Sequence, residues 1–186
     1  MPEDGVLLRQ ARKILFRVSE LRLVRQIAQH RSERGLARAE QDGAPLAVAI
    51  FDIDHFKAIN DSHGHSVGDE VLVQFAGILR LQARFIDHVG QAPERTLGRF
   101  GGEEFMIILP GTSLAGARVC LERMRAAVAQ APFETSAGPV HVTFSAGLAE
   151  QRPDEAAEVL LQRADEALYR AKEGGRDRLE LDTPTQ

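Results

Sequence analysis

The sequence predicts an α+β protein in which helices pack against one largely antiparallel sheet. The segment 101–104 (Gly-Gly-Glu-Glu) separates two strand-like segments, 96–100 and 105–109, which is the pattern of a β-hairpin. Amphipathic helical segments separate the other strand-like ones. Hydrophobic residues make up 44% of the 186 residues and charged residues 27%, which is enough for a globular core. The expected order is β-α-α-β-β-α-β-α-β, and the central hairpin favours an antiparallel sheet.

The elements before the hairpin begin with a strand. Residues 46–51 are apolar throughout and predict a buried strand that runs directly into a short helix over 52–61. A glycine-punctuated turn at 62–68 leads to a long helix, expected over 69–85, and 87–95 predicts a loop.

The elements after the hairpin alternate between helix and strand. They are a helix from the cap at 110–113 to about residue 130, a strand over 140–148, a helix opened by Pro153–Asp154 and ended by Gly174–Gly175, and a last strand over 179–181. We expect 182–186 to be a loose tail.

Residues 1–43 predict a helical linker ahead of a domain over 44–181. Apolar residues recur there with the 4-3-4-3 spacing of a coiled-coil seam: Leu7, Ala11, Ile14, Val18 and Leu21. A short coiled coil and an amphipathic helix packed on the following domain both satisfy this spacing.

Composition excludes several classes of function. The net charge of −4 and a pI of about 5.9 give no indication of binding to nucleic acid. Cys120 is the single cysteine, which excludes an internal disulfide and fits a reducing compartment. No apolar stretch is long enough to span a bilayer and no signal peptide is recognisable, so we expect a soluble, cytoplasmic domain.

Two acidic residues form a candidate metal site. Asp52 follows the first strand directly, and Glu103 lies at the hairpin tip. If that strand lies beside the hairpin, the two carboxylates converge at one sheet edge, with the carbonyl of Ile53 as a third donor. Mg²⁺ prefers a site with one or two protein acids that substrate and water complete. Two plainer interpretations stay open: Asp52 as a helix N-cap and the tip as a solvated turn.

Further residues suit a nucleotide. A strand that turns abruptly into a helix exposes amide groups at 54–57, and Lys57 adds a positive charge unless it is only a surface lysine. Lys172 and Arg176 are four residues apart around a helix end; they either face a triphosphate or complement the helix dipole.

Asn60 and Asp69 are candidate readers of a base. An Asp accepts the paired N–H donors on the edge of guanine, and an Asn offers both a donor and an acceptor. The competing interpretation makes Asn60 a helix C-cap and Asp69 an N-cap.

Four blocks resemble the GGDEF family of diguanylate cyclases, in the variant whose signature reads Gly-Gly-Glu-Glu-Phe. The blocks are 52–61, 64–69, 101–105 and 167–176, and residues 142–147 match the family's penultimate strand. The resemblance covers about 44–181 and implies a βααββαβ core like the palm of nucleotidyl cyclases and polymerases.

The resemblance also implies an activity. Two GTP molecules, one on each subunit of an antiparallel homodimer, become cyclic di-GMP and two pyrophosphates. The implied cofactor is Mg²⁺ or Mn²⁺, two ions per GTP. Cyclic di-GMP is then both product and inhibitor. The resemblance further implies a longer parent protein, in which a sensor or receiver domain precedes the linker and which a membrane anchor would also suit.

The resemblance assigns roles by matching position. Asp52, the carbonyl of Ile53 and Glu103 bind metal, and Glu103 accepts the proton of the 3′-hydroxyl. The other assigned roles are guanine recognition by Asn60 and Asp69, phosphate binding by the backbone of His55 and Phe56 with Lys172 and Arg176, transition-state stabilisation by Lys57, and close approach of the nucleotide at Gly101 and Gly102.

The chain departs from the family in two places. The usual segment before the first strand is reduced to a vestige at 32–36. The family's inhibitory Arg-x-x-Asp motif is absent at its usual distance from the signature, where Ala92 and Arg95 stand. Arg84 and Asp87 match the motif further upstream. They either form a displaced inhibitory site or simply end the long helix. A catalytically silent module that binds GTP or cyclic di-GMP is the alternative function.

Overall fold

The structure, a computed structural model, describes residues 44–87 and 96–182. The chain divides into two units, Met1–Gly43 and Ala44–Gln186, and every described residue belongs to the second. The predictions of a helical linker over 1–43, of most of the loop over 87–95 and of the tail after 182 lie outside the described residues.

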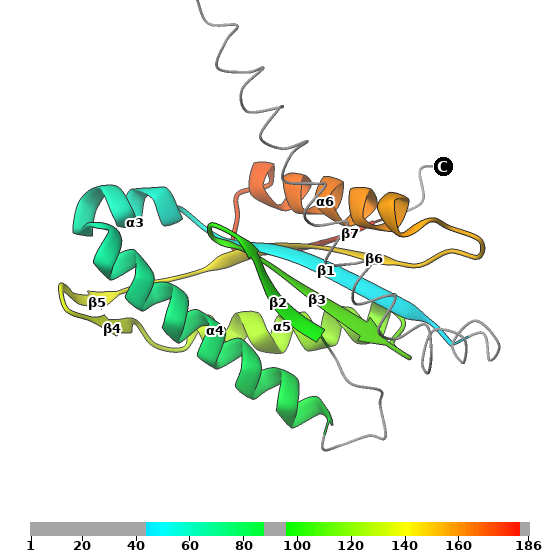
Figure 1. The fold of residues 1–186 in the computed structure, drawn as a ribbon, viewed down its shortest axis with the longest axis horizontal. Coiled ribbons are helices and arrows are strands. Elements are labelled where there is room, and N and C mark those ends of the chain that lie inside the picture. The colour runs from blue at the N-terminus through cyan, green and yellow to red at the C-terminus, as the bar shows by residue number, and fades with distance from the viewer. Residues whose placement is uncertain (1–43, 88–95, 183–186) are drawn as a thin grey trace, which may run out of the picture. The chain divides into compact units, whose positions relative to one another are not determined.

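Five strands form one sheet in the order β2-β3-β1-β6-β7 (Figure 1). They are β1 (Leu46–Ile53), β2 (Thr96–Gly101), β3 (Glu104–Pro110), β6 (Phe144–Glu150) and β7 (Leu179–Leu181). β1 lies between β3 and β6 and is antiparallel to both, β2 and β3 form the predicted hairpin, and β7 runs parallel to β6. The predicted α+β fold with a mostly antiparallel sheet is confirmed.

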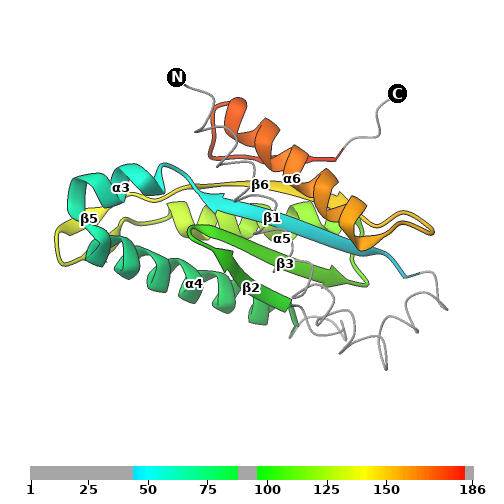
Figure 2. The ribbon, with the colours of Figure 1, turned by 45° about the horizontal axis from the view of Figure 1, so that its top comes forward.

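Helices cover both faces of this sheet (Figure 2). They are α3 (Phe56–His63), α4 (His65–Asp87), α5 (Leu114–Ala129) and α6 (Ala157–Glu173). α4 and α5 lie on one face and α6 on the other. In the described part of the chain none of the helices is both long and apolar enough to cross a membrane.

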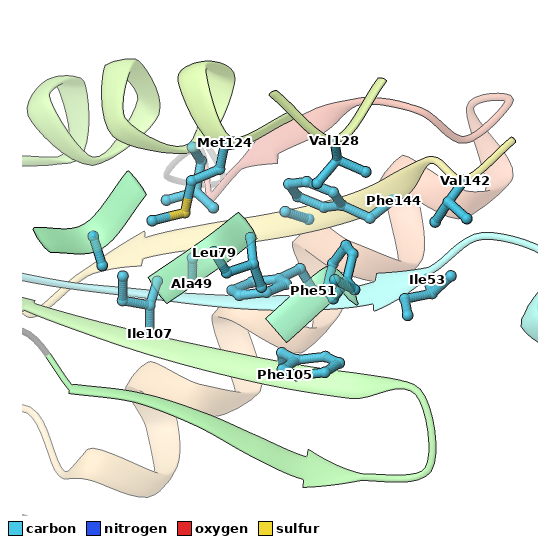
Figure 3. Close-up of a cluster of buried hydrophobic side chains, with 14 of the residues drawn as sticks. Ala49, Phe51, Ile53, Leu79, Phe105, Ile107, Met124, Val128, Val142 and Phe144 are labelled. Carbon is cyan, nitrogen blue, oxygen red and sulfur yellow. The ribbon is translucent and has the colours of Figure 1, made fainter. Parts of the chain in front are cut away.

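The main core lies between the sheet and the α4–α5 layer. Four phenylalanines form its centre (Phe51, Phe75, Phe105 and Phe144), and the ring centroids of five pairs among them lie 5.0 to 6.4 Å apart. Figure 3 labels Phe51, Phe105 and Phe144. Side chains alternate between the faces of a strand. Because Phe51 and Ile53 both point into this core, Asp52 points to the opposite face, toward α6.

α6 packs unusually close to β6. A Cβ atom on Gly147 would lie 2.1 Å from the carbonyl oxygen of Ala164 and 2.1 Å from the amide nitrogen of Leu168. The absence of a side chain at position 147 therefore lets the backbone of α6 rest on the sheet, with Ala164 and Ala167 buried at the contact. This packing brings the end of α6 near the end of β1.

Several predicted boundaries were wrong around the candidate site. β1 continues to Ile53, and α3 begins only at Phe56, after a turn in which His55 adopts φ 57°. α4 begins at His65 instead of Asp69. Asp52 is therefore a strand residue and not an N-cap, and Asp69 lies in the second turn of α4.

A further hairpin, β4 (Phe133–Thr135) and β5 (Gly138–Val140), was missed. The predicted strand over 140–148 is instead the end of β5, a short connection and β6. The hairpin is held by α4, because Glu70 accepts hydrogen bonds from the amide and hydroxyl of Ser136 at 2.7 and 2.6 Å. Hydrogen bonds between residues so far apart in the chain produce no local sequence pattern that would predict this hairpin.

The start of α6 also differs from the prediction. Asp154 has φ 56°, in the left-handed region, so it belongs to a turn, and α6 begins at Ala157. The predicted end of this helix at Gly174 and the cap of α5 by Ser113 are both confirmed.

Candidate active site

Asp52 occupies the end of the central strand on the α6 face. It lies opposite Glu104 of β3 and Ser145 of β6, so these residues form one row across the sheet. Asp52 is buried, with 7% of its surface exposed. Its Oδ2 atom lies 2.8 Å from Nζ of Lys172, near the end of α6. A predicted metal ligand and a predicted phosphate ligand are thus in direct contact.

The acidic groups of this row oppose one another's ionisation. Burial raises the pKa of Asp52; Lys172 offsets part of that rise, and the charges of Glu103 and Asp54 add to it. Burial also raises the pKa of Glu104, and the charge of Asp52 raises it further. Bringing like charges together in a buried position is costly, and a bound cation would relieve that cost.

The hairpin tip lies against the end of β1. The amide of Ile53 donates a hydrogen bond to the carbonyl oxygen of Glu103 at 3.3 Å. Gly102 turns the chain with φ 53°, and its carbonyl accepts a hydrogen bond from Nε of Arg99 at 2.8 Å. Glu103 is half-buried, so the tip packs against the end of β1 and is not only a solvated turn.

The available donors are suited to a hard cation. In the ranges 44–87 and 96–182, no three His, Cys, Asp or Glu side chains are arranged to hold a metal ion alone. Mg²⁺ commonly takes one or two protein carboxylates and completes its shell with substrate oxygens and water. Asp52 and Glu103 stay the predicted carboxylates for such a site, and Glu104 lies opposite Asp52 across the sheet.

Fewer backbone amides are available to an anion than the predicted range 54–57 implies. The amide of Asp54 already donates to the carbonyl oxygen of Thr143 at 2.9 Å, so it is not available to a ligand. His55 precedes α3 without a side-chain cap, which leaves the first-turn amides from His55 onward for an anion. Lys57 is exposed on the first turn of the same helix.

Asn60 and Asp69 come from the two consecutive helices α3 and α4. Asn60 is an interior residue of α3, since the C-cap is Gly64, so the C-cap interpretation is wrong. An ideal Cβ on Gly68 would lie 2.0 Å from Oδ1 of Asn60. Gly68 thus provides the space in which the Asn60 amide lies, next to exposed Asp69.

Lys172 and Arg176 lie on either side of the end of α6. Lys172 belongs to the last turn, and Arg176 follows the C-cap Gly174 with φ 64°. Because Lys172 is paired with Asp52, its role goes beyond complementing the helix dipole. Gly101 ends β2, beside the tip that carries Glu103.

Arg84 and Asp87 are the last predicted site residues. Both belong to the final turn of α4, which ends at Asp87. Their side chains lie outside the described part of the structure, and the prediction of an inhibitory site there stays a prediction.

Sequence reasoning missed Asp54 and Glu104. Asp54 is buried and accepts hydrogen bonds from Oγ1 of Thr143, Oγ of Ser145 and the amide of Asp177, at 2.8, 2.7 and 3.0 Å. The Asp-x-Asp spacing was an available signal, because alternate residues of a strand share a face. Glu104 follows Glu103 but starts β3, where pairing with β1 places it opposite Asp52.

This fold and site define a cyclase-type α+β domain with a polymerase-palm-like core. The chain matches the family model of the diguanylate cyclase GGDEF domain over residues 23–178. It is 49% identical over 151 residues to diguanylate cyclase DgcP of Pseudomonas aeruginosa, covering 81% of this chain and 21% of that protein. Response regulator PleD of Caulobacter vibrioides is 42% identical over 143 residues, covering 75% and 30%.

Solved structures agree with this assignment. The GGDEF domain of DgcB from Caulobacter crescentus, solved in complex with c-di-GMP, superimposes with a TM-score of 0.70 at 35% identity, covering 79% of this chain and 83% of that chain. The active GGEEF domain of a diguanylate cyclase from Vibrio cholerae gives 0.70 at 34% identity, covering 81% and 90%. The chain belongs to the GGDEF family of diguanylate cyclases. It spans less than a third of the length of the two curated relatives above.

Proposed function

We propose that this chain is an active diguanylate cyclase, which converts two GTP molecules into cyclic di-GMP and two pyrophosphates. The observation that carries the proposal is the convergence of Asp52, Glu104 and Lys172 at the end of β1, with the Glu103 tip hydrogen-bonded to the same strand end. Acids for a divalent ion and a cation for phosphate are thereby combined in one place.

The metal part of the proposal assigns Asp52, Glu103 and the carbonyl oxygen of Ile53 to Mg²⁺ or Mn²⁺, with two ions per GTP. These ions would supply Lewis-acid stabilisation of charge on the phosphate and the attacking oxygen. The raised pKa values of Asp52 and Glu104 support the assignment, because closely placed buried acids favour a cation among them.

The proposed reaction is a displacement at phosphorus. The 3′-oxygen of one GTP attacks the α-phosphorus of the other; an O–P bond forms, the bond between the α-phosphorus and the bridging oxygen breaks, and pyrophosphate leaves. Glu103 accepts the 3′-hydroxyl proton, and Lys57 stabilises the charge that develops. The same step with the roles of the two nucleotides exchanged releases the second pyrophosphate and closes the ring.

The remaining residues bind and orient the nucleotide. The backbone of His55 and Phe56 and the side chains of Lys172 and Arg176 bind phosphates, and the backbone at Gly101 and Gly102 lets the nucleotide approach closely. Asn60 and Asp69 recognise guanine. Their position on adjacent helices beside Gly68 supports a shared role.

The reaction requires two nucleotides that face one another. The described residues contain one such constellation, so we infer that an antiparallel homodimer supplies the second GTP. A sensor or receiver domain in a longer protein would control that encounter. Cyclic di-GMP would act as inhibitor, and titration calorimetry with Arg84→Ala tests whether Arg84 belongs to its site.

One observation favours a silent nucleotide-binding module instead. Lys172 already neutralises Asp52, as it would in a protein that binds a nucleotide without a metal. Incubation with GTP and Mg²⁺, followed by chromatography for cyclic di-GMP and pyrophosphate, separates the two functions. Product formation is expected; binding of GTP without product would establish the silent module.

A further inference from the structure

The turn between α6 and β7 (residues 174–178, the α6–β7 turn) adopts a conformation that its residues disfavour. Arg176 and Asp177 have φ 64° and 45°, two consecutive non-glycine residues in the left-handed region. Such residues are uncommon, and they persist only where the surroundings hold them. The turn carries Arg176, the second proposed phosphate ligand.

Hydrogen bonds within the turn hold its backbone. The amides of Gly174 and Arg176 donate to the carbonyl oxygens of Arg170 and Ala171, at 2.8 and 3.1 Å. The carbonyl oxygen of Arg176 accepts from Nε of Arg178 at 3.2 Å. These bonds continue the end of α6. The turn meets the sheet at its last residue, where the carbonyl oxygen of Arg178 accepts from the amide of Ala146 of β6 at 2.9 Å.

Asp177 adds contacts to β1 and to α5. Its amide donates to Oδ2 of Asp54, at the end of β1, at 3.0 Å. Nη1 of Arg125, on α5, donates to the Asp177 carbonyl oxygen at 3.2 Å and to its Oδ1 at 2.9 Å. Glu122 holds Arg125 in turn through Nε at 3.0 Å. Asp177 is thus clamped between the end of β1 and α5, which covers the sheet face opposite α6.

The residue next to the clamp has a free charge. Among the described residues, none forms a hydrogen bond or ion pair with the guanidinium of Arg176. Asp177, held by its amide, carbonyl oxygen and Oδ1, lies beside an Arg176 whose guanidinium has no partner among the described residues. This is the arrangement expected where one residue is fixed so that its neighbour can meet a ligand.

We propose that Asp177 and Arg125 are positioning residues for the proposed cyclase: they fix the left-handed turn so that Arg176 meets the triphosphate. The inference rests on the proposed function, because it requires a nucleotide at Lys172 and Arg176. Arg125 itself touches no proposed ligand of metal or nucleotide. Its effect on the nucleotide must therefore pass through Asp177 to Arg176.

The test measures equilibrium binding of the inert analogue α,β-methylene-GTP with Mg²⁺, using the whole chain. Arg125→Ala is expected to weaken binding about three- to ten-fold, because Arg176 would lose its charge-assisted contact with a phosphate of the analogue. Arg118→Ala is the matched control, since it removes the same charge from an exposed position of α5. Asp177→Asn keeps an acceptor and tolerates the left-handed conformation, so it should bind like the parent.

A double-mutant cycle separates positioning from a general loss of stability. In an Arg176→Ala background, Arg125→Ala should weaken binding no further, and hydrogen exchange at the Asp177 amide should accelerate in Arg125→Ala. If Arg125→Ala and Arg176→Ala have additive effects on binding, or if Arg125→Ala binds the analogue like the parent, the positioning role is overturned and the proposed function is not affected. Should Arg125→Ala not fold, Asp177→Ala takes its place in the cycle. A parent protein that does not bind the analogue overturns the proposed function and this inference with it.

Discussion

Lys172 and Asp52 form an ion pair with 2.8 Å between Nζ and Oδ2, at the point where the last helix meets the end of the central strand. The lysine side chain is 31% exposed and the aspartate side chain 10%. The pair offsets part of the cost of burying Asp52. A divalent cation at Asp52 would compete with this ammonium group for the carboxylate, and an ammonium group displaced in this way would be available to a phosphate.

Lys172→Met should affect metal and nucleotide in opposite directions. Without the competing ammonium, Mn²⁺ alone should bind several-fold more tightly, because a nearby positive charge opposes a divalent cation. α,β-Methylene-GTP should bind more weakly, because a phosphate ligand is lost. Titration calorimetry measures both constants. Arg118→Met, which removes an exposed charge from α5 on the other face of the sheet, should leave both constants unchanged. Equal or weaker Mn²⁺ binding in Lys172→Met would contradict the competition.

Glu103→Ala should abolish product formation and leave the fold intact. Loss of a proposed metal ligand and general base is expected to lower the rate of cyclic di-GMP synthesis at least about 100-fold. Circular dichroism should show an unchanged thermal transition, since Glu103 lies at a hairpin tip. Glu134→Ala, at an exposed position, should keep parental activity. A Glu103→Ala protein with a normal rate would refute the assigned role.

Gly68→Ala should reduce recognition of guanine. The new Cβ would lie 2.0 Å from Oδ1 of Asn60, so the amide must leave its position. We expect the ratio of kcat/KM for GTP over ATP to fall about ten-fold or more, as for a lost specific hydrogen bond.

Gly77→Ala is the control on the same helix. Nothing lies within 4 Å of its Cβ position, so activity should not change. The free energy of unfolding should rise by about 0.5–1 kcal/mol, because alanine favours a helix. Unchanged nucleotide preference in Gly68→Ala would show that Asn60 does not read the base.

Gly147→Ala should destabilise the fold. The added methyl group would lie 2.1 Å from backbone atoms of Ala164 and Leu168, so α6 must move away from the sheet. A loss of about 2–3 kcal/mol in the free energy of unfolding is expected from urea titration. Gly98→Ala, with open space at its Cβ position, should cost little. Equal stability of the two variants would show that the close packing of α6 is not required.

Glu104→Gln should stabilise the protein at neutral pH and not in acid. Burial and the charge of Asp52 raise the pKa of Glu104 above its ordinary value of 4.5, so ionising it costs more in the folded state. Below pH 4.5 the Glu104 carboxyl is protonated in both the folded and the unfolded state, so Glu104→Gln gains little stability over the parent. As pH rises through the folded-state pKa, the parent loses stability that the variant keeps.

Urea unfolding at several pH values, without metal or nucleotide, measures this difference. Glu134→Gln serves as the exposed control and should show no such dependence on pH. An advantage of Glu104→Gln that is the same at every pH would indicate a packing effect instead of a charge effect.

Much of the fold could be predicted from local patterns. The apolar run before Asp52, the Gly-Gly tip before Glu103 and the helix ended by Gly174 each have a local physical cause, and each is present in the structure. Boundaries were wrong where distant contacts decide them. α4 starts at His65, where it packs against α3, and the hairpin near Ser136 is hydrogen-bonded to Glu70 of α4.

The sequence by itself determined the five strands of the main sheet, the presence of four helices and the chemical types of residue near their ends, because periodicity and backbone preference act within a few residues. Only the tertiary structure decided which of these groups meet. Lys172 reaches Asp52 because Gly147 lets α6 lie on the sheet, and Asp54 holds Asp177 across 123 residues of chain. Such partners follow from how faces pack, and packing is a property of the whole core.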